Sequence, residues 1–325
     1  MTTTFEDVPD AVSVVMAVAD ADGLYWTEDS GALRALGRGA TTSVELRPAV
    51  TEPITVLGML TDATTLYWSD AGSNVGGPPS ADGPPPPSRL YAAPKTGGTV
   101  ELVFELETDI MYPLALHAGG VIVRSQGRLH RVSNAGLETL THIPPSSSEY
   151  HQVVDGVAYW LSRNEAAETW VLLAASLDGG PPRIVSALEG ASGSPTNFQV
   201  TPGRVLWLLQ RTQFDPLVSV EKLMMLDLST GCIQELPSLG ESIGQGVLDA
   251  SHVYWRSFNG LASASPGHQN GALPFVRVNL VTGAFERVVS GFDVTISTDP
   301  LAHDEAAIYF RRHLERSLVR VLKPD

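Results

Sequence analysis

DGLYWTE, at residues 22–28, is the stretch that decides the fold, because it returns along the chain. Clear copies are TTLYWSD at 64–70, GVAYWLS at 156–162 and SHVYWRS at 251–257, and weaker copies are GGVIVRS at 119–125, GRVLWLL at 203–209 and AAIYFRR at 306–312. If the Tyr of the first copy is taken as the anchor, the seven anchors are residues 25, 67, 122, 159, 206, 254 and 309. Repetition at the intervals that separate these anchors is typical of proteins built from similar structural units. The sequence therefore predicts seven such units.

Each unit has the same internal order of apolar stretches. A first strand such as VSVVMAV (12–18) leads to a turn, in which an aspartate often lies five residues before the anchor: Asp20, Asp62, Asp249 and Asp304. The aromatic strand follows, then a third strand such as RLYAAP (89–94) and a fourth such as TVELVFEL (99–106). Four short strands per unit, without helical periodicity, are typical of a β-propeller blade. The predicted fold class is all-β: a seven-bladed β-propeller with four antiparallel strands per blade.

The two ends of the chain are predicted to meet. The seventh unit stops after its third strand, SLVRVLKPD (317–325), whereas TTTFEDV (2–8) resembles a fourth strand such as FERVV (285–289). Residues 1–10 are therefore predicted to complete the C-terminal blade, so that residues 1–325 form a single β-propeller domain. Closing the ring in this way removes two unpaired sheet edges.

The Tyr-Trp pairs are predicted to fill the spaces between blades rather than to form a ligand cage, and the turn aspartates to accept backbone N–H bonds. Four of the six tryptophans lie in clear copies of the motif and Trp207 in a weak copy. Only Trp170 remains, which weakens a carbohydrate-binding interpretation.

The segments LYWTE and LYWSD, with the preceding aspartate, resemble the YWTD repeats of low-density-lipoprotein-receptor-type propellers, and the unit also resembles related bacterial propeller repeats. The resemblance covers most of the chain, at a few positions per unit. It implies the propeller fold; in the receptor family such propellers have six blades and bind protein ligands on one face. This chain departs from that family in its seven units and in the eroded motif of units three, five and seven.

Composition narrows the functional class. Of 325 residues, 43% are hydrophobic, the net charge is -15, and the single Cys232 allows no internal disulfide. Residues 1–15 lack the features of a secretory signal, and no apolar run is long enough to span a bilayer. Strong negative charge argues against nucleic-acid or membrane binding. We expect a cytoplasmic monomer without cofactor.

Arginines follow the anchor in units three to seven, whereas units one and two carry acids there. They are predicted to gather near the mouth of the central channel beside aromatic and polar side chains, and to bind the carboxylate or phosphate of an anionic ligand. The predicted ligand-binding residues are Arg124, Arg163, Arg211, Arg256, Arg311, Arg312, Tyr112, Tyr150, His151 and His313. The competing interpretation is that each arginine pairs with a nearby acid such as Asp109.

The function predicted from these residues is a binding or scaffold propeller that engages a peptide, a protein or a small anionic ligand on the arginine-bearing face. The alternative is an enzyme, a hydrolase, lyase or cyclase, with its site in the central pocket. Catalytic sequence motifs are absent, the catalytic residues are unknown, and His117, His151 and His303 are expected to be structural rather than metal ligands. Two loops are long and irregular, 69–89 and 256–274; the Pro-rich loop 69–89 is interpreted either as a tolerated insertion or as a lid or partner-docking arm.

Overall fold

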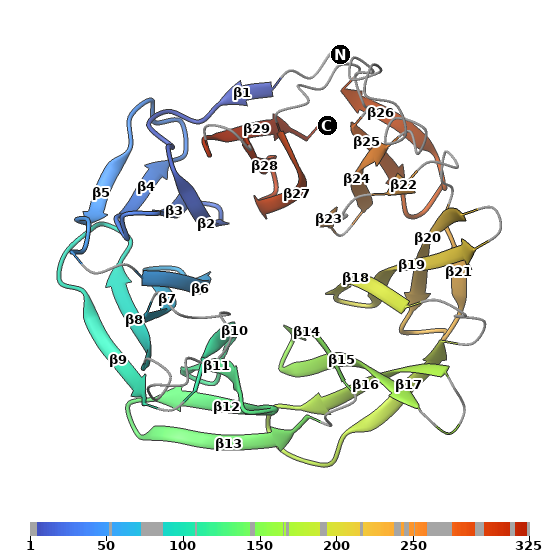
Figure 1. Ribbon diagram of the computed structural model, residues 1–325. Helices are drawn as coiled ribbons and strands as arrows, with labels where there is room; N and C mark the ends of the chain where they lie inside the picture. The colour runs from blue at the N-terminus through green and yellow to red at the C-terminus, as the bar shows by residue number, and fades with distance from the viewer. Residues whose placement is uncertain are drawn as a thin grey trace.

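The computed structural model describes residues 5–51, 54–72, 87–107, 109–143, 147–164, 166, 169–188, 194–214, 217–236, 242–243, 247–249, 251–258, 275–289, 296–312 and 316–323. Its strands form seven antiparallel sheets arranged as blades around a central axis (Figure 1). This confirms the prediction of a seven-bladed β-propeller. Within the described residues, no helix is long and apolar enough to cross a membrane.

The strands of each blade follow one another from the axis outward. The innermost strands are β2 (Val14–Ala19), β6 (Ile54–Thr61), β10 (Tyr112–His117), β14 (Ser147–Val154), β18 (Ser194–Thr201), β22 (Ser242–Ile243) with β23 (Val247–Leu248), and β27 (Ile296–His303). The second strands are β3 (Gly23–Glu28), β7 (Thr65–Gly72), β11 (Gly120–Ser125), β15 (Val157–Asn164), β19 (Arg204–Phe214), β24 (His252–Phe258) and β28 (Ala307–Arg312).

The outer half of each blade is formed by two further strands. The third strands are β4 (Leu33–Gly37), β8 (Ser88–Pro94), β12 (Arg128–Ser133), β16 (Thr169–Ser176), β20 (Leu217–Asp227), β25 (Phe275–Asn279) and β29 (Leu318–Leu322). The outermost strands are β5 (Val44–Arg47), β9 (Glu101–Leu106), β13 (Gly136–His142), β17 (Arg183–Leu188), β21 (Ile233–Glu235), β26 (Phe285–Val289) and, for the last blade, β1 (Phe5–Asp7).

The N-terminal strand closes the ring, as the sequence predicts. In the register of β1 on β29, Glu6 lies opposite Arg320, and Arg320 Nη2 lies 2.7 Å from Glu6 Oε2. The N–H of Val8 donates to the carbonyl of Leu318 at 3.0 Å. Val8 is buried in a cluster that contains Trp26 of the first blade and Leu318 of the last. The N-terminal segment therefore contacts both blades that meet at the seam.

The motif tryptophans form the core between adjacent blades. Trp26, Trp68, Trp160 and Trp255 are almost completely buried. Trp68 packs with Tyr25 and Leu33 of the preceding blade, and Trp160 packs with Ile122 of the blade before it. These contacts confirm the structural role that the repeat predicts for the aromatic pairs.

The two faces of the ring differ in their connections. We call the loop face the one on which the innermost strands begin and the second strands end, and the turn face the opposite one, where tight turns join innermost to second strands. In four blades an aspartate caps this turn: Asp62 Oδ1, for example, accepts the N–H groups of Thr64 at 2.8 Å and Thr65 at 2.7 Å. The turns at Asp20, Asp249 and Asp304 have the same pair of bonds. The predicted capping role of these aspartates is confirmed.

One lysine crosses a seam on the turn face to reach such an aspartate. Lys95, which follows β8 of the second blade, places Nζ 2.6 Å from Oδ2 of Asp20 in the first blade. The same ammonium lies 5.5 Å from the centre of the Tyr25 ring. The Lys95 side chain is only 7% exposed, so the ion pair and the cation–π contact are shielded from solvent.

Lys323 makes the same contacts between the last two blades: its Nζ lies 3.0 Å from Asp249 Oδ2 and 5.2 Å from the centre of the Tyr254 ring. Burial raises the pKa of Asp249, but the N–H groups of Ser251 and His252 and the ammonium of Lys323 outweigh burial and lower this pKa to about 2. A carboxylate with a depressed folded pKa stabilises the fold above its ordinary pKa of 3.8, and this contribution is lost as the pH falls toward 2.

Replacement of Lys323 by Met is therefore expected to lower the free energy of unfolding by about 1 kcal/mol at pH 7, a modest value because Asp249 is partly exposed. The difference between variant and parent narrows below pH 3, where Asp249 becomes protonated in the variant first. Thermal unfolding at pH 7 and at pH 2 measures both. A deficit of equal size at the two pH values would mean that Lys323 acts through packing alone.

Candidate functional site

On the loop face, Arg124 and Tyr112 form the best-defined part of the predicted arginine site. They lie directly opposite each other on the paired strands β11 and β10, at the end of one and the start of the other. The guanidinium of Arg124 lies 4.6 Å from the centre of the Tyr112 ring. Both residues are half-buried. Stacking on the ring orients the guanidinium at the entry of an innermost strand, which suits planar recognition of a carboxylate or phosphate.

Arg311 lies in the corresponding register of the last blade. It is half-buried, and its Nη1 lies 3.5 Å from the carbonyl oxygen of Val14, the first residue of the neighbouring innermost strand β2. Arg312, the next residue, instead forms an ion pair with Asp7 of the outermost strand β1 at 2.7 Å. Adjacent residues of a strand point to opposite sides, so the structure does not bring these two arginines together.

The other predicted residues are more scattered. Arg163 is exposed near the end of β15, and His151 lies opposite Trp160 within β14. The side chains of Tyr150, Arg211 and Arg256, and the whole of His313, lie outside the described residues. Asp109, the acid named as a competing partner, accepts a hydrogen bond from Ser125 Oγ.

A buried ion pair that the sequence did not predict lies on the same face between the first two blades. Arg47, at the end of β5, donates from Nε and Nη2 to the carbonyl of Gly31 at 3.1 and 2.7 Å. Its Nη1 lies 3.9 Å from Asp70 Oδ2, and its guanidinium lies 5.2 Å from the centre of the Trp68 ring. Burial raises the pKa of the Asp70 carboxyl, and the charge of Arg47 opposes that rise. The contacts of Arg47 are therefore structural, within the fold.

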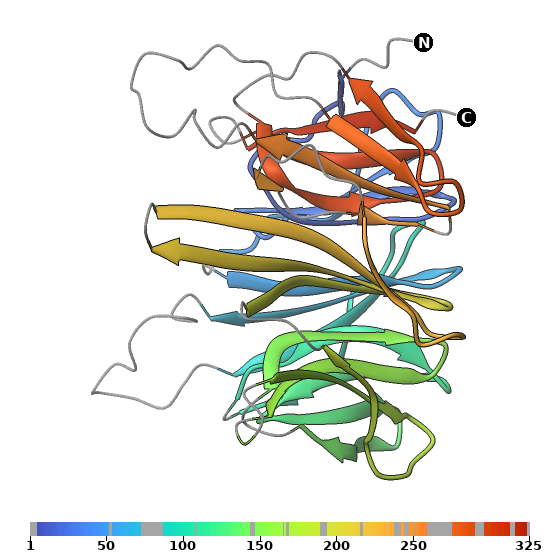
Figure 2. The same ribbon diagram turned by 90° about the vertical axis from the view of Figure 1, so that its right-hand side faces the viewer.

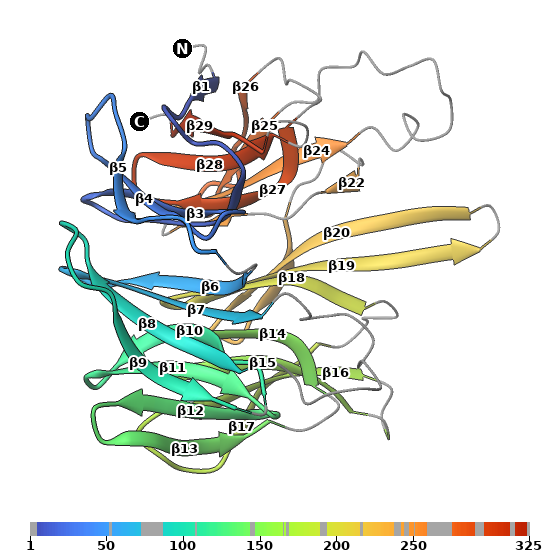
Figure 3. The same ribbon diagram turned by 60° about the vertical axis from the view of Figure 1, so that its left-hand side comes forward.

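The β19–β20 hairpin extends from the loop face. Its strands pair without interruption from Arg204 opposite Asp227 to Phe214 opposite Leu217. Figures 2 and 3 show this hairpin reaching well beyond the strands of the neighbouring blades. The repeat predicts an ordinary blade here; the signal for a longer hairpin is the uninterrupted run from 204 to 227 with only two residues between its strands. The hairpin forms a wall on the face that carries the arginines.

Histidines and acids do not assemble into a metal site in the described part of the chain, where no three such side chains lie close enough to share an ion. His117, one of the histidines considered from the sequence, lies on the turn face, with Nε2 3.0 Å from Asp178 Oδ1. It is therefore at the opposite end of β10 from Tyr112.

Similarity to solved structures supports the fold. The structure of YCF48 bound to D1 peptide has a TM-score of 0.65 and 10% sequence identity, and the match covers 100% of this chain and 98% of that one. YCF48 from Cyanidioschyzon merolae matches with a TM-score of 0.61 and 10% identity over 98% of each chain. Oligogalacturonate lyase from Vibrio parahaemolyticus matches with a TM-score of 0.55 and 9% identity, over 94% of this chain and 75% of the lyase.

No family model matches the chain, and no curated protein is significantly similar to it in sequence. At about one residue in ten identical, the structural matches establish the class alone: a seven-bladed β-propeller. Proteins of this shape include one solved with a peptide and one that is a lyase. The function must therefore be argued from the site.

Proposed function

We propose that this protein is a binding propeller that engages an acidic peptide, or an acidic segment of a partner protein, on its loop face. The observation that carries the proposal is the stacked pair of Arg124 and Tyr112 at the entry of β10. Stacking on an aromatic ring holds a guanidinium in a defined orientation, and bidentate bonds from a guanidinium to a carboxylate are among the stronger hydrogen bonds in proteins.

Charge distribution supports the same proposal. A net charge of -15 repels acidic ligands in general, so acidic partners approach only where positive groups gather. Arg124 and Arg311 occupy equivalent registers on the loop face, and Arg256 shares that register in sequence. The projecting β19–β20 hairpin adds a wall against which an extended segment can lie.

Two analogies agree with this assignment. YCF48, of similar overall fold, was solved with a peptide, and the YWTD repeats that the sequence resembles belong to propellers that bind protein ligands on one face. The proposed partner is defined by its acidic groups. Its proposed binding site lies beside the arginines and is not taken from a site of those proteins.

The experiment is a peptide array in which acidic peptides are paired with amide counterparts, Asp replaced by Asn and Glu by Gln. We expect the parent to retain acidic members selectively. The double variant Arg124→Glu/Arg311→Glu should weaken the best of them by about tenfold or more, because attraction becomes repulsion. Fluorescence anisotropy with the selected peptide gives the affinities.

The matched control is Arg183→Glu/Arg287→Glu, which changes the net charge equally at two exposed positions of the outermost strands β17 and β26. The control should bind like the parent. Equal losses in both double variants would assign the effect to overall charge and contradict a loop-face site. A large fall in melting temperature of the first variant alone would show that its arginines are structural.

A further inference from the structure

The seams on the turn face follow a rule that links two positions of the repeat. The first is the turn residue five before the anchor; the second, which we call the cover residue, follows the third strand of the next blade. In six blades the cover residue donates its N–H to the carbonyl three residues before its own anchor, so these positions are equivalent: Arg38, Lys95, Leu177, Leu228, Leu280 and Lys323. In the second blade, Leu90 pairs with Ser69, two residues after the anchor, and Lys95 follows Leu90 by five residues. In the third blade, Leu129 pairs with Arg124 in the same register, so Asn134, five residues after Leu129, is the cover residue.

At three of the four seams whose turn residue is an aspartate, the cover residue is a cation. Lys95 covers Asp20, and Lys323 covers Asp249, in both cases with the ammonium near the anchor tyrosine. At the seam between the last and first blades, the positive charge of Arg38 acts on Tyr309, whose hydroxyl donates to Asp304 at 3.1 Å.

Where the turn residue is not an acid, the cover residue is a leucine. The turn residues there are His117, Val154 and Thr201. Each leucine lies in the same apolar cluster as the anchor of the preceding blade: Leu177 with Ile122, Leu228 with Tyr159, and Leu280 with Leu206. Six seams therefore match a carboxylate with a cation, or a turn residue that is not an acid with an apolar side chain.

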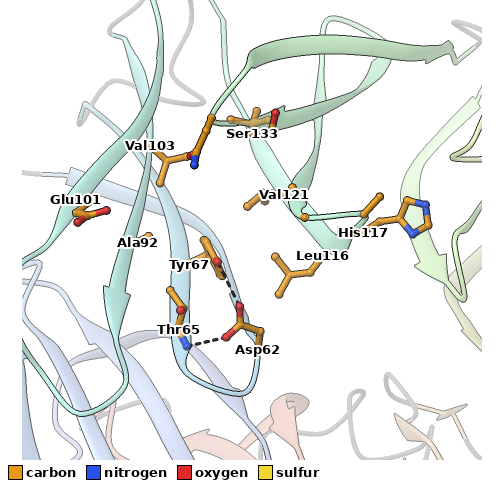
Figure 4. Close-up of a pocket in the computed structure, with 15 residues that line it drawn as sticks. Asp62, Thr65, Tyr67, Ala92, Glu101, Val103, Leu116, His117, Val121 and Ser133 are labelled. Atoms are coloured by element: carbon orange, nitrogen blue, oxygen red, sulfur yellow. Dashed lines mark hydrogen bonds between the residues drawn. The ribbon is translucent and has the colours of Figure 1, made fainter.

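The seam between the second and third blades departs from this rule. Its turn residue is Asp62 and its anchor is Tyr67, as at the lysine-covered seams, but its cover residue is the uncharged, exposed Asn134. Asp62, Tyr67 and Asn134 line a cavity of about 520 Å³ that opens between the two blades. Figure 4 shows Asp62 bonded to Thr65 and Tyr67, with Leu116 and Val121 beside it.

The chemistry of the cavity resembles that around the buried lysines. Asp62 uses Oδ1 for the turn and accepts the Tyr67 hydroxyl on Oδ2 at 3.2 Å, while the equivalent Oδ2 of Asp20 accepts both a hydroxyl and the Lys95 ammonium. Glu101 adds a second carboxylate, and no lysine or arginine is among the residues that line the cavity. The rest of its wall combines the apolar Ala92, Val103, Leu116, Val121 and Val132 with the polar Thr65, His117 and Ser133.

We propose that this cavity binds a primary alkylammonium group, with Asp62 and the Tyr67 ring taking the charge and the apolar wall taking the carbon chain. The two lysine-covered seams show that this pair of residues holds an ammonium when the chain itself supplies one. At the third blade Asn134 is too short and uncharged to do so. The ammonium therefore comes from outside the chain, as a small amine or as a lysine side chain of a partner.

The test compares the parent with Asn134→Lys, which supplies the missing cover cation from within. NMR titration with n-butylammonium should show saturable binding to the parent, on the order of 1 mM for a ligand of about five heavy atoms. Asn134→Lys should raise the melting temperature and weaken this binding by about tenfold or more. Asp62→Asn, which keeps a side-chain oxygen for the turn, should also weaken binding by about tenfold.

The matched control is Ala135→Lys, which adds the same charge at the adjacent exposed position and should leave binding unchanged. Absence of butylammonium binding by the parent, or unchanged binding by Asn134→Lys, would overturn the proposal. A blocked lysine tripeptide and its norleucine counterpart distinguish the sources: tighter binding of the lysine peptide than of butylammonium assigns a protein partner, and equal or weaker binding assigns a small amine. Because the cavity lies on the turn face, Arg124→Glu/Arg311→Glu should leave it unaffected, which separates this outcome from that of the loop-face proposal.

Discussion

Deletion of residues 1–10 is expected to lower the free energy of unfolding by about 4 kcal/mol. The deletion removes the pairing of β1 with β29, the bond from Val8 to Leu318 and the burial of Val8 against both flanking blades. Burial of one valine contributes about 1.5 kcal/mol and each backbone bond about 1 kcal/mol. For a chain of this length, 1 kcal/mol corresponds to about 1.5 °C, so the melting temperature should fall by about 6 °C.

The control is a shorter deletion of residues 1–4, which leaves β1 in place and should melt like the parent. A synthetic peptide of residues 1–10 should restore part of the lost stability when added to the shortened protein, because it can pair again with the exposed edge of β29. The exposed edge should also make the shortened protein aggregate on heating. An unchanged melting temperature after the longer deletion would contradict closure of the ring by β1.

The repeat was sufficient to predict the fold because each blade buries the same kind of apolar strand between its neighbours. The apolar anchor pairs, such as Tyr67 and Trp68, mark the strand that is covered on both sides, and their recurrence counts the blades. The incomplete last unit predicted the partner of β29 in the same way, since a blade with three strands has an unpaired edge. These patterns lie within one repeat unit and can therefore be detected in a single sequence.

The candidate sites were harder to predict from the sequence because they depend on contacts between blades. The sequence placed Arg311 and Arg312 together, yet one contacts Val14 of the next blade and the other Asp7 of the N-terminal strand. The buried partner of Asp70, Arg47, comes from the outermost strand of a different blade. No spacing within one unit encodes such a pair.

A signal for the turn-face seams was present in the sequence but requires comparing one unit with the next. Two of the three lysines of the chain follow a third strand, and each belongs to the unit after one with a turn aspartate. Only once the ring is closed does it become clear that these two positions touch. The third blade, with Asn134 in place of a lysine, then stands out as the seam that lacks a cation.

Replacement of Arg47 by Met should destabilise the fold by about 3 kcal/mol at pH 7. Asp70 is only 4% exposed, and without Arg47 its charge would remain buried without the ion pair that opposes burial. Breaking a buried pair by removal of one partner costs about 3–5 kcal/mol, and the lower end applies here because the two charged atoms are 3.9 Å apart. Lys222→Met, whose ion pair with Glu235 is largely exposed, is the surface control and should cost about 0.5 kcal/mol.

The pH dependence identifies the cause. Burial already raises the pKa of Asp70 above 3.8 in the parent, and loss of Arg47 should raise it further. An acid whose folded pKa lies above its unfolded pKa destabilises the fold at high pH, and this penalty disappears as the pH falls through the folded pKa toward 3.8. Urea unfolding at pH 8, 6 and 5 should therefore show the deficit of Arg47→Met shrinking as the pH falls. In Arg47→Met/Asp70→Asn, where no charge remains to titrate, the deficit should be smaller and independent of pH. A deficit of Arg47→Met that stays constant from pH 8 to 5 would instead assign the loss to the contacts of Arg47 with Gly31 and Trp68.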